Sequence, residues 1–252
     1  MLWYQAWLET RSRFVIGLLV LIVLAVGTVC DYLAVVKLMP LAGALPPDTT
    51  GRLRAVIELQ RTFHGYVWVQ WFRQTFANAG AIVAVLLGSG TVFTRGSDGA
   101  ALFTLSLPVL RADVLRVRWI VGLAEWLAAS IVPALTVALV APAIGQQYAI
   151  GPAVLYGVSA FVAGTVLYSG AALLSTMFPD VWRPLLLGCG IAVVLAVVEM
   201  AVPMRGVGLF RVMSAERYFY TGAVPWIGWL SCAVISTALF AAAARRLNRR
   251  DF

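Results

Sequence analysis

The sequence predicts an all-α integral membrane protein with six transmembrane helices. Of its 252 residues, 62% are hydrophobic and only 12% are charged, and the mean hydropathy is +0.90. Soluble domains carry roughly 45–50% apolar and about 25% charged residues. The apolar residues also form runs long enough to cross a hydrocarbon core of about 30 Å, which takes about 20 helical residues. These values exclude a soluble enzyme, a disordered chain, a collagen-like fibre and a disulfide-rich secreted module.

Six apolar stretches are predicted to span the membrane. They cover residues 14–36, 76–94, 119–141, 151–178, 185–202 and 224–244. The first follows a short polar segment, residues 1–13, and is longer than the roughly 7–15 residue core of a cleavable signal peptide, so we expect it to be retained.

The basic residues predict that both termini lie in the cytoplasm. An even number of spans places the two termini on one side of the membrane. With the N-terminus inside, eleven of the 19 basic residues lie on the cytoplasmic side and eight outside. Five of the outer eight fall in one long loop, where the positive-inside rule counts them less.

The long outer loop, residues 37–75, is predicted to contain an amphipathic helix. Apolar residues from Leu53 to Trp71 recur with the spacing of one helix face, and Arg54 and Glu58 share the other face. Trp68, Trp71 and Tyr66 suit the headgroup level of a bilayer. This helix either anchors the second span or acts as a lid over an outer exit.

The inner loop, residues 95–118, is predicted to contain a short apolar helix from Asp98 to Leu107. Ser97 or Asp98 caps its start, and Pro108 ends it. Arg111, Arg116 and Arg118 follow. An apolar helix exposed on the cytoplasmic side needs a partner or the bilayer to cover it.

This loop resembles a segment of the membrane subunits of ABC-2 type transporters. The stretch from Gly99 to Arg111 reads Gly-Ala-Ala-Leu-Phe-Thr-Leu-Ser-Leu-Pro-Val-Leu-Arg. It is similar to the family pattern Gly-Thr-Leu-Glu-x-Leu-Leu-Ser-Leu-Pro-Val-Ser-Arg. The predicted spans and the basic tail, residues 245–252, extend the resemblance over the whole chain. Ala100, Leu102 and Leu110 depart from the pattern.

The resemblance implies a type V exporter-like transmembrane domain in a bacterial cytoplasmic membrane. It implies a dimer with a second permease copy or a similar chain, driven by a separate ATPase that binds ATP and magnesium. The residues that it assigns to coupling with the ATPase are Asp98, Gly99, Leu102, Phe103, Leu105, Leu107, Pro108 and Arg111. It also implies that residues 203–223 form either a re-entrant segment or an ordinary outer loop.

Three carboxylates fall within the predicted spans: Asp31, near the outer interface, where solvation is favoured over a functional site, and the more deeply placed Glu125 and Glu199. Charges in hydrocarbon are unfavourable and are candidates for a functional role. Glu125 lies about two turns into the third span, where Arg118 or Arg116 favours structural pairing. Glu199 lies late in the fifth span, so it either lines a transport pathway or plays a structural part. The two are predicted at different depths and cannot form a catalytic pair.

Small residues recur every four positions on two spans. They are Gly80, Ala84 and Gly88 on the second span, and Gly188, Ala192 and Ala196 on the fifth. Such stripes allow helices to pack closely in lipid. By resemblance to the family, the same stripes alternatively line a central cavity between two subunits.

The remaining chemistry-bearing residues predict no cofactor, no metal site and no catalytic site in this chain. Three cysteines without paired spacing and one histidine, His64, give no disulfide framework and no zinc site. The only lysine, Lys37, is not part of a phosphate-binding loop. The pI of 9.9 reflects bases at span ends, which predicts contact with membrane lipid rather than nucleic acid.

The sequence therefore favours a permease subunit of an ATP-driven exporter. The alternatives are a membrane assembly or sensor protein that uses the same fold without transport, and an intramembrane enzyme. The enzyme is disfavoured because no nucleophile, base and orienting group occur together.

Overall fold

The chain folds into a bundle of long helices, and no strand occurs in the parts that the structure describes. The computed structural model describes residues 2–42, 51–89, 111–178, 180, 182–201 and 208–248. Five of the described helices are long and apolar enough to cross a membrane. These stretches are Trp3–Leu38, Arg116–Ile144, Ile150–Ser175, Trp182–Ala201 and Trp226–Arg246.

The five apolar helices overlap five of the six predicted spans. They belong to α1 (Leu2–Ala42), α6 (Arg111–Val140), α7 (Ile150–Ser175), α8 (Trp182–Ala201) and α11 (Trp226–Asn248). The all-α membrane prediction is confirmed at this level. The second predicted span, 76–94, begins in α4 (Phe76–Ser89), and its last residues lie outside the described part of the chain.

Helix α7 forms the centre of the bundle. It packs against α4, α6 and α11 along its length and also meets α8 and the short helix α9 (Leu209–Met213). Small residues make this possible: Gly164 lies directly against the indole of Trp126, whose Nε1–H donates to the carbonyl oxygen of Phe161 at 3.0 Å. Helix α1 packs mainly against α6, on the outside of the bundle.

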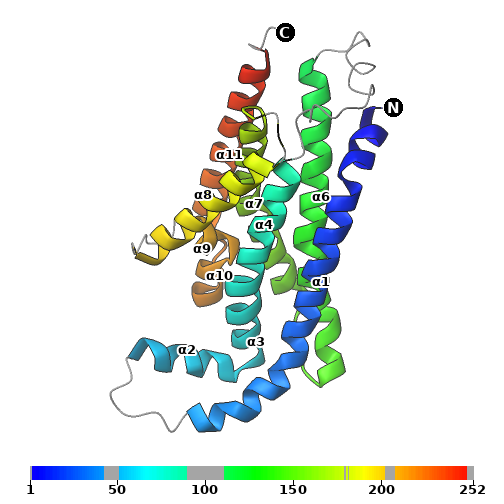
Figure 1. Ribbon diagram of the computed structural model, residues 1–252. Coiled ribbons are helices and arrows are strands. Elements are labelled where there is room, and N and C mark those ends of the chain that lie inside the picture. The colour runs from blue at the N-terminus through cyan, green and yellow to red at the C-terminus, as the bar shows by residue number, and fades with distance from the viewer. Residues whose placement is uncertain are drawn as a thin grey trace.

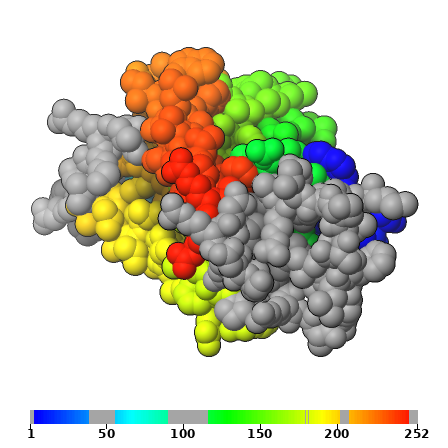
Figure 2. Space-filling view, turned by 90° about the horizontal axis from the view of Figure 1, so that it is seen from above, coloured from blue at the N-terminus to red at the C-terminus, as the bar shows by residue number. Residues whose placement is uncertain are grey.

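Both chain termini lie at one end of the bundle, which we call the terminal end (Figure 1). Figure 2 looks onto this end and shows the last turns of α11 near its middle, with α8 to one side and α6 to the other. The opposite, distal end carries α2 (Gly51–Arg61), which lies across the bundle (Figure 1).

The structure divides the predicted amphipathic helix of the outer loop into two parts. Helix α2 ends at Arg61, and Thr62 is extended, with φ −89° and ψ 140°. The Thr62 side chain accepts a hydrogen bond from the backbone N–H of Gly65 and so caps a new helix. A Cβ at position 65 would meet the carbonyl oxygen of Leu59 at 2.0 Å, so glycine permits the tight turn.

The new helix runs without a break from Phe63 to Ser89. It comprises α3 (Phe63–Tyr66), the π-helix η1 (Val67–Thr75) and α4. It therefore starts 13 residues before the predicted second span at Phe76, and it enters the bundle. As a result, Trp68, Trp71 and Tyr66 are buried in the core rather than exposed on a separate surface helix.

Two short helices lie between α8 and α11. Helix α9 packs on α4, α7 and α11, and α10 (Glu216–Thr221) follows it after a turn. Both lie alongside the distal half of the bundle in Figure 1 and do not extend beyond α2. The predicted loop 203–223 thus contains two helices in its described part that fold back onto the spans.

Candidate functional site

At the terminal end, two polar contacts join the first turns of α1 to α6. The guanidinium of Arg118 binds the carboxylate of Glu9, with Nη2 at 2.9 Å from Oε1 and 2.7 Å from Oε2. Two turns further along α6, Oε1 of Glu125 accepts a hydrogen bond from the hydroxyl of Thr10 at 2.5 Å. Glu125 is buried, and its Oε2 has no hydrogen-bond partner among the described residues.

The structure changes the expected pairing of Glu125. Arg118 or Arg116 was expected to pair with it, but Arg118 lies seven positions away on α6, or about 10 Å along the helix. Arg118 instead binds Glu9 of α1. The hydroxyl of Thr10, which belongs to α1, provides a hydrogen bond to one of the two carboxylate oxygens of Glu125. Periodicity along one helix could not indicate that contact.

Of the residues expected to couple to an ATPase, the structure describes only Arg111. Asp98, Gly99, Leu102, Phe103, Leu105, Leu107 and Pro108 lie outside the described residues. Arg111 begins α6, two turns before Arg118. The predicted coupling segment therefore leads directly into α6, the helix whose Arg118 and Glu125 contact Glu9 and Thr10 of α1. On the far side, the indole of Trp119 stacks on Phe240 of α11 at 4.3 Å between ring centroids.

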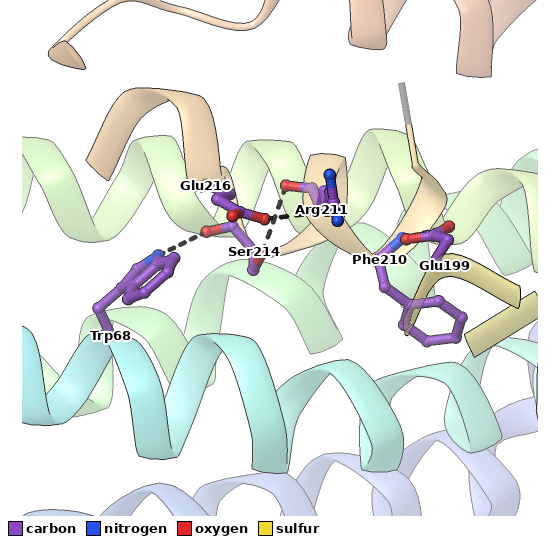
Figure 3. A network of polar contacts seen from close by, with 6 residues as sticks. All are labelled: Trp68, Glu199, Phe210, Arg211, Ser214 and Glu216. Atoms are coloured by element: carbon purple, nitrogen blue, oxygen red, sulfur yellow. Dashed lines mark hydrogen bonds and ion pairs between the residues drawn. The ribbon is translucent and has the colours of Figure 1, made fainter. Parts of the chain in front are cut away.

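Glu199 binds the start of helix α9. Its Oε1 and Oε2 accept from the backbone N–H of Phe210, at 3.2 and 3.1 Å (Figure 3). A Cβ at Gly208 would lie 2.5 Å from Oε2, so the approach needs glycine. The N–H groups of a first helical turn have no partner within the helix and attract a carboxylate. This contact supplies a structural role for Glu199, the carboxylate considered for a pathway.

The small-residue stripes are covered by neighbouring helices of the same chain. On α4, Gly80 faces Met213 of α9, and Gly88 faces the Tyr168 carbonyl of α7. On α8, Gly188 faces Val85 of α4. Ala84 and Ala192 are buried as well. Both stripes thus take part in packing within one chain.

An aromatic cluster occupies the distal end. Four rings stack pairwise in the order Tyr148, His64, Phe219 and Trp68, which we call the ring column; Tyr148 lies in the connection before α7, and the other three lie in α3, α10 and η1. Successive ring centroids are 5.2, 5.7 and 4.0 Å apart, with interplanar angles of 21°, 11° and 8°. Partial burial lowers the pKa of His64 from its usual 6.5, so the imidazole at neutral pH is mainly uncharged.

Further side chains fix the two ends of this column. The Trp68 Nε1–H donates to the carbonyl oxygen of Ser214 at 2.9 Å (Figure 3). The Arg73 guanidinium lies 5.5 Å from the Trp68 ring centroid. At the other end, the hydroxyls of Tyr148 and Tyr156 are buried and have no hydrogen-bond partner among the described residues. Burial raises the pKa of Tyr148, so its hydroxyl stays a neutral donor.

Sequence reasoning missed the Glu9–Arg118 and Thr10–Glu125 contacts and the aromatic column. The signal that was available is the number of aromatic residues in two segments that were predicted to be outer loops: Tyr66 and Trp68 in one, and Tyr218, Phe219 and Tyr220 in the other. Two aromatic segments on the same side of a membrane can be expected to meet, although the sequence does not specify which rings stack.

The described residues contain no group of three or more His, Cys, Asp or Glu side chains placed to hold a metal ion. Comparisons with known proteins add no functional assignment. No family model, no curated protein and no solved structure matches the chain.

Proposed function

We propose that the chain is the membrane subunit of an ATP-driven transporter of the ABC-2 type. One observation supports this best: the start of α1, the start of α6 and the last turns of α11 lie together at the terminal end (Figure 1). The Glu9–Arg118 ion pair and the Trp119–Phe240 stack connect them. A partner that docks at this end would act on three spans at once.

The connection from α4 to α6 is the proposed docking segment. It leaves α4 after Ser89 and enters α6 at Arg111. A helix transmits displacement along its axis as a rigid element, so movement of the segment would shift α6. Arg118 would pass that movement to α1, and Trp119 would pass it to α11. Residues 98–111 thereby couple ATP hydrolysis in a separate subunit to the spans.

The proposal includes six spans, with α4 and the residues after it as the second, and both termini in the cytoplasm. Two permease copies form the transport pathway, and the direction is export. The exposed apolar side chains of α8 are compatible with a lipid-facing or subunit-facing helix. Leu186, Ile191, Val193, Val194, Val197 and Met200 are all at least half exposed.

The test is a pull-down of the tagged, full-length chain from its native membrane in mild detergent. We expect an ATPase subunit to co-purify in stoichiometric amount. The double variant Leu105→Asp and Leu107→Asp should lose the ATPase while still inserting into the membrane. The control, Leu38→Asp, places the same charge on an exposed residue at the distal end of α1 and should retain it.

Each result is decisive for a different part of the proposal. A folded chain that brings down no ATPase would overturn the transporter assignment and favour an assembly or sensor protein. An ATPase that remains bound to the double variant would overturn the docking segment but not the transporter. Equal loss in the Leu38 control would show that any added carboxylate disrupts the complex, which also contradicts a specific docking segment.

A further inference from the structure

Glu125 lies at a junction of three helices, α1, α6 and α7. Its side chain is buried, at 4% exposure, within a stretch of α6 that is apolar enough to cross a membrane. Thr10 contacts it from α1. Tyr168 of α7 is fully buried and lies within electrostatic range of the carboxyl group, and its hydroxyl donates to the backbone carbonyl of Trp119 at 3.3 Å. A carboxyl group in such a place is a candidate for a functional role.

None of the ion pairs in the described part of the chain includes Glu125. The charged side chains on the neighbouring parts of α1 and α6 are Glu9, Arg11, Arg13, Arg116 and Arg118, and those near the end of α11 are Arg245 and Arg246. Helices α4 and η2 (Ala141–Ile144), which also pack on α6, carry no ionisable side chain. Arg118 is engaged with Glu9. An ionised Glu125 would therefore be a buried charge without a paired cation.

The hydroxyl of Thr10 has several acceptors within reach but only one proton. Its oxygen lies 3.1 and 3.4 Å from the backbone carbonyl oxygens of Ala6 and Trp7, and 2.5 Å from Oε1 of Glu125. If Glu125 is ionised, the hydroxyl donates to the carboxylate, and neither carbonyl receives its proton. If Oε1 carries a proton, Glu125 donates to Thr10, and Thr10 donates to Ala6. The protonated form therefore uses both contacts at once.

The second carboxyl oxygen of Glu125 supports the same interpretation. Oε2 is buried and has no hydrogen-bond partner among the residues that the structure describes. In a carboxylate this oxygen shares the negative charge, and a buried charged group without a partner is more unfavourable than a neutral one. In the protonated acid it is a neutral carbonyl oxygen. The surroundings of both oxygens thus suit a group that takes up a proton.

We propose that Glu125 is a reversible proton-binding site and that the bound proton holds the first turns of α1 against α6. With the proton bound, hydrogen bonds run from Glu125 through Thr10 to Ala6. Loss of the proton leaves a buried charge, so the first turns of α1 move away from α6 and water reaches the carboxylate. The proton exchanges with water at the terminal end, where the side chain of Glu9 is 52% exposed. The inference goes beyond the proposed function and does not depend on an ATPase partner.

Infrared spectroscopy of the purified full-length chain in detergent detects the proton directly, because a protonated carboxyl group has a C=O stretching band that a carboxylate lacks. Spectra are recorded from pH 5.5 to pH 9. We expect the difference between wild type and Glu125→Gln to contain this band at pH 5.5 and to lose it by pH 9. The control Glu58→Gln removes an exposed carboxyl group at the distal end and should leave the band unchanged.

Hydrogen exchange of residues 2–13 measures the attachment of α1. After correction for the intrinsic pH dependence of exchange, we expect roughly tenfold faster exchange at pH 9 than at pH 5.5, as the loss of about one hydrogen bond predicts. Glu125→Gln keeps a neutral donor beside Thr10, so its exchange should stay slow at both pH values. Thr10→Val removes the hydroxyl, so its exchange should be fast at both. Thr10→Val should also shift the C=O band, which assigns the band to Glu125 even if Glu125→Gln does not fold.

Three results would overturn the proposal. The same carboxyl band in wild type, Glu125→Gln and Thr10→Val at pH 5.5 would show that Glu125 binds no proton in this range. A Glu125 band that persists to pH 9 would show a permanently neutral, structural acid. A band that titrates while exchange of residues 2–13 stays constant, or changes equally in Glu125→Gln, would show that the proton does not hold α1.

Discussion

The indole N–H of Trp68 donates to the carbonyl oxygen of Ser214 over 2.9 Å, and the two residues lie 146 positions apart in the chain. Ser214 follows the last residue of α9, and the left-handed Ala215 comes directly after it, so the helical hydrogen-bond ladder ends there. The freed carbonyl points to η1, where Trp68 is fully buried. This bond fixes the turn between α9 and α10 against the second helical segment of the bundle.

We expect Trp68→Phe to destabilise the protein by about 2 kcal/mol. The substitution keeps an aromatic ring beside Phe219 but removes the indole N–H that donates to the buried Ser214 carbonyl, and a buried polar group left without its partner costs about 1–3 kcal/mol. The measurement is thermal unfolding in detergent. Trp226→Phe is the control because Trp226 is 62% exposed. Equal melting temperatures for the two variants would contradict a structural role of the bond.

Glu199 should stabilise the start of α9 through its carboxylate oxygens. Glu199→Ala removes both acceptors from the Phe210 N–H and should cost about 1 kcal/mol, as the loss of a helix cap does. Glu199→Gln keeps one acceptor oxygen and should cost less. Amide hydrogen exchange of residues 209–213 is the direct readout. If exchange were the same in both variants and the wild type, Glu199 would not act as a cap.

The apolar spans could be predicted from the sequence because both length and hydropathy are local properties of a segment. The break at Thr62 was missed for the opposite reason: apolar spacing continues through it, and one extended residue is enough to start a new helix. Because the apolar spacing continues through Thr62, Trp68 was also expected to lie on a helix at the membrane surface. Its burial depends on the carbonyl of Ser214 and the ring of Phe219, which come from distant parts of the chain.

The polar groups of the candidate site were predicted as residues but not as pairs. Glu125 and Glu199 stood out because carboxylates are rare in spans. Their partners, the Thr10 hydroxyl and the Phe210 backbone N–H, are common groups that carry no signal of their own. The pairing depends on how α1 lies on α6 and how the chain returns after α8, and both are set by tertiary packing.

Gly88 should be essential for the contact between α4 and α7. A Cβ at this position would lie 2.3 Å from the Tyr168 carbonyl oxygen and 2.9 Å from the Ala171 Cβ, so the helices must separate to admit a methyl group. We expect Gly88→Ala to cost about 1–3 kcal/mol, the range for overpacking a core. Gly170→Ala on α7 is the control because its Cβ would meet no atom within 4 Å. Alanine there should be neutral or stabilising.

The Glu9–Arg118 ion pair should couple α1 to α6 energetically. Glu9→Arg places two cations together and should lower the melting temperature, and adding Arg118→Glu should restore part of the loss. The side chain of Arg118 is only 15% exposed, whereas that of Glu9 is 52% exposed. We therefore expect a coupling energy of about 1 kcal/mol, near the upper value for exposed pairs. Additive effects of the two substitutions would show that the residues do not interact.

His64 should make the aromatic cluster less stable in mild acid. Burial lowers its pKa in the folded protein below the usual 6.5. Between the lowered and the usual pKa, the unfolded chain binds more protons than the folded one, so the free energy of unfolding falls as the pH drops through this range. Protonation would also place a charge between Tyr148 and Phe219, where it is partly desolvated.

We expect acid to destabilise α10 before it unfolds the whole protein, since no residue of α10 is fully buried and the helix packs on the ring column. Hydrogen exchange of residues 216–221 should therefore accelerate between pH 7.5 and pH 5.5, after correction for the intrinsic pH dependence of exchange. His64→Gln keeps a polar side chain of similar size that does not titrate and should remove this acceleration. Other acidic groups titrate in both proteins, so the decisive quantity is the difference between wild type and variant. The same acid response in His64→Gln would assign the change to a different group.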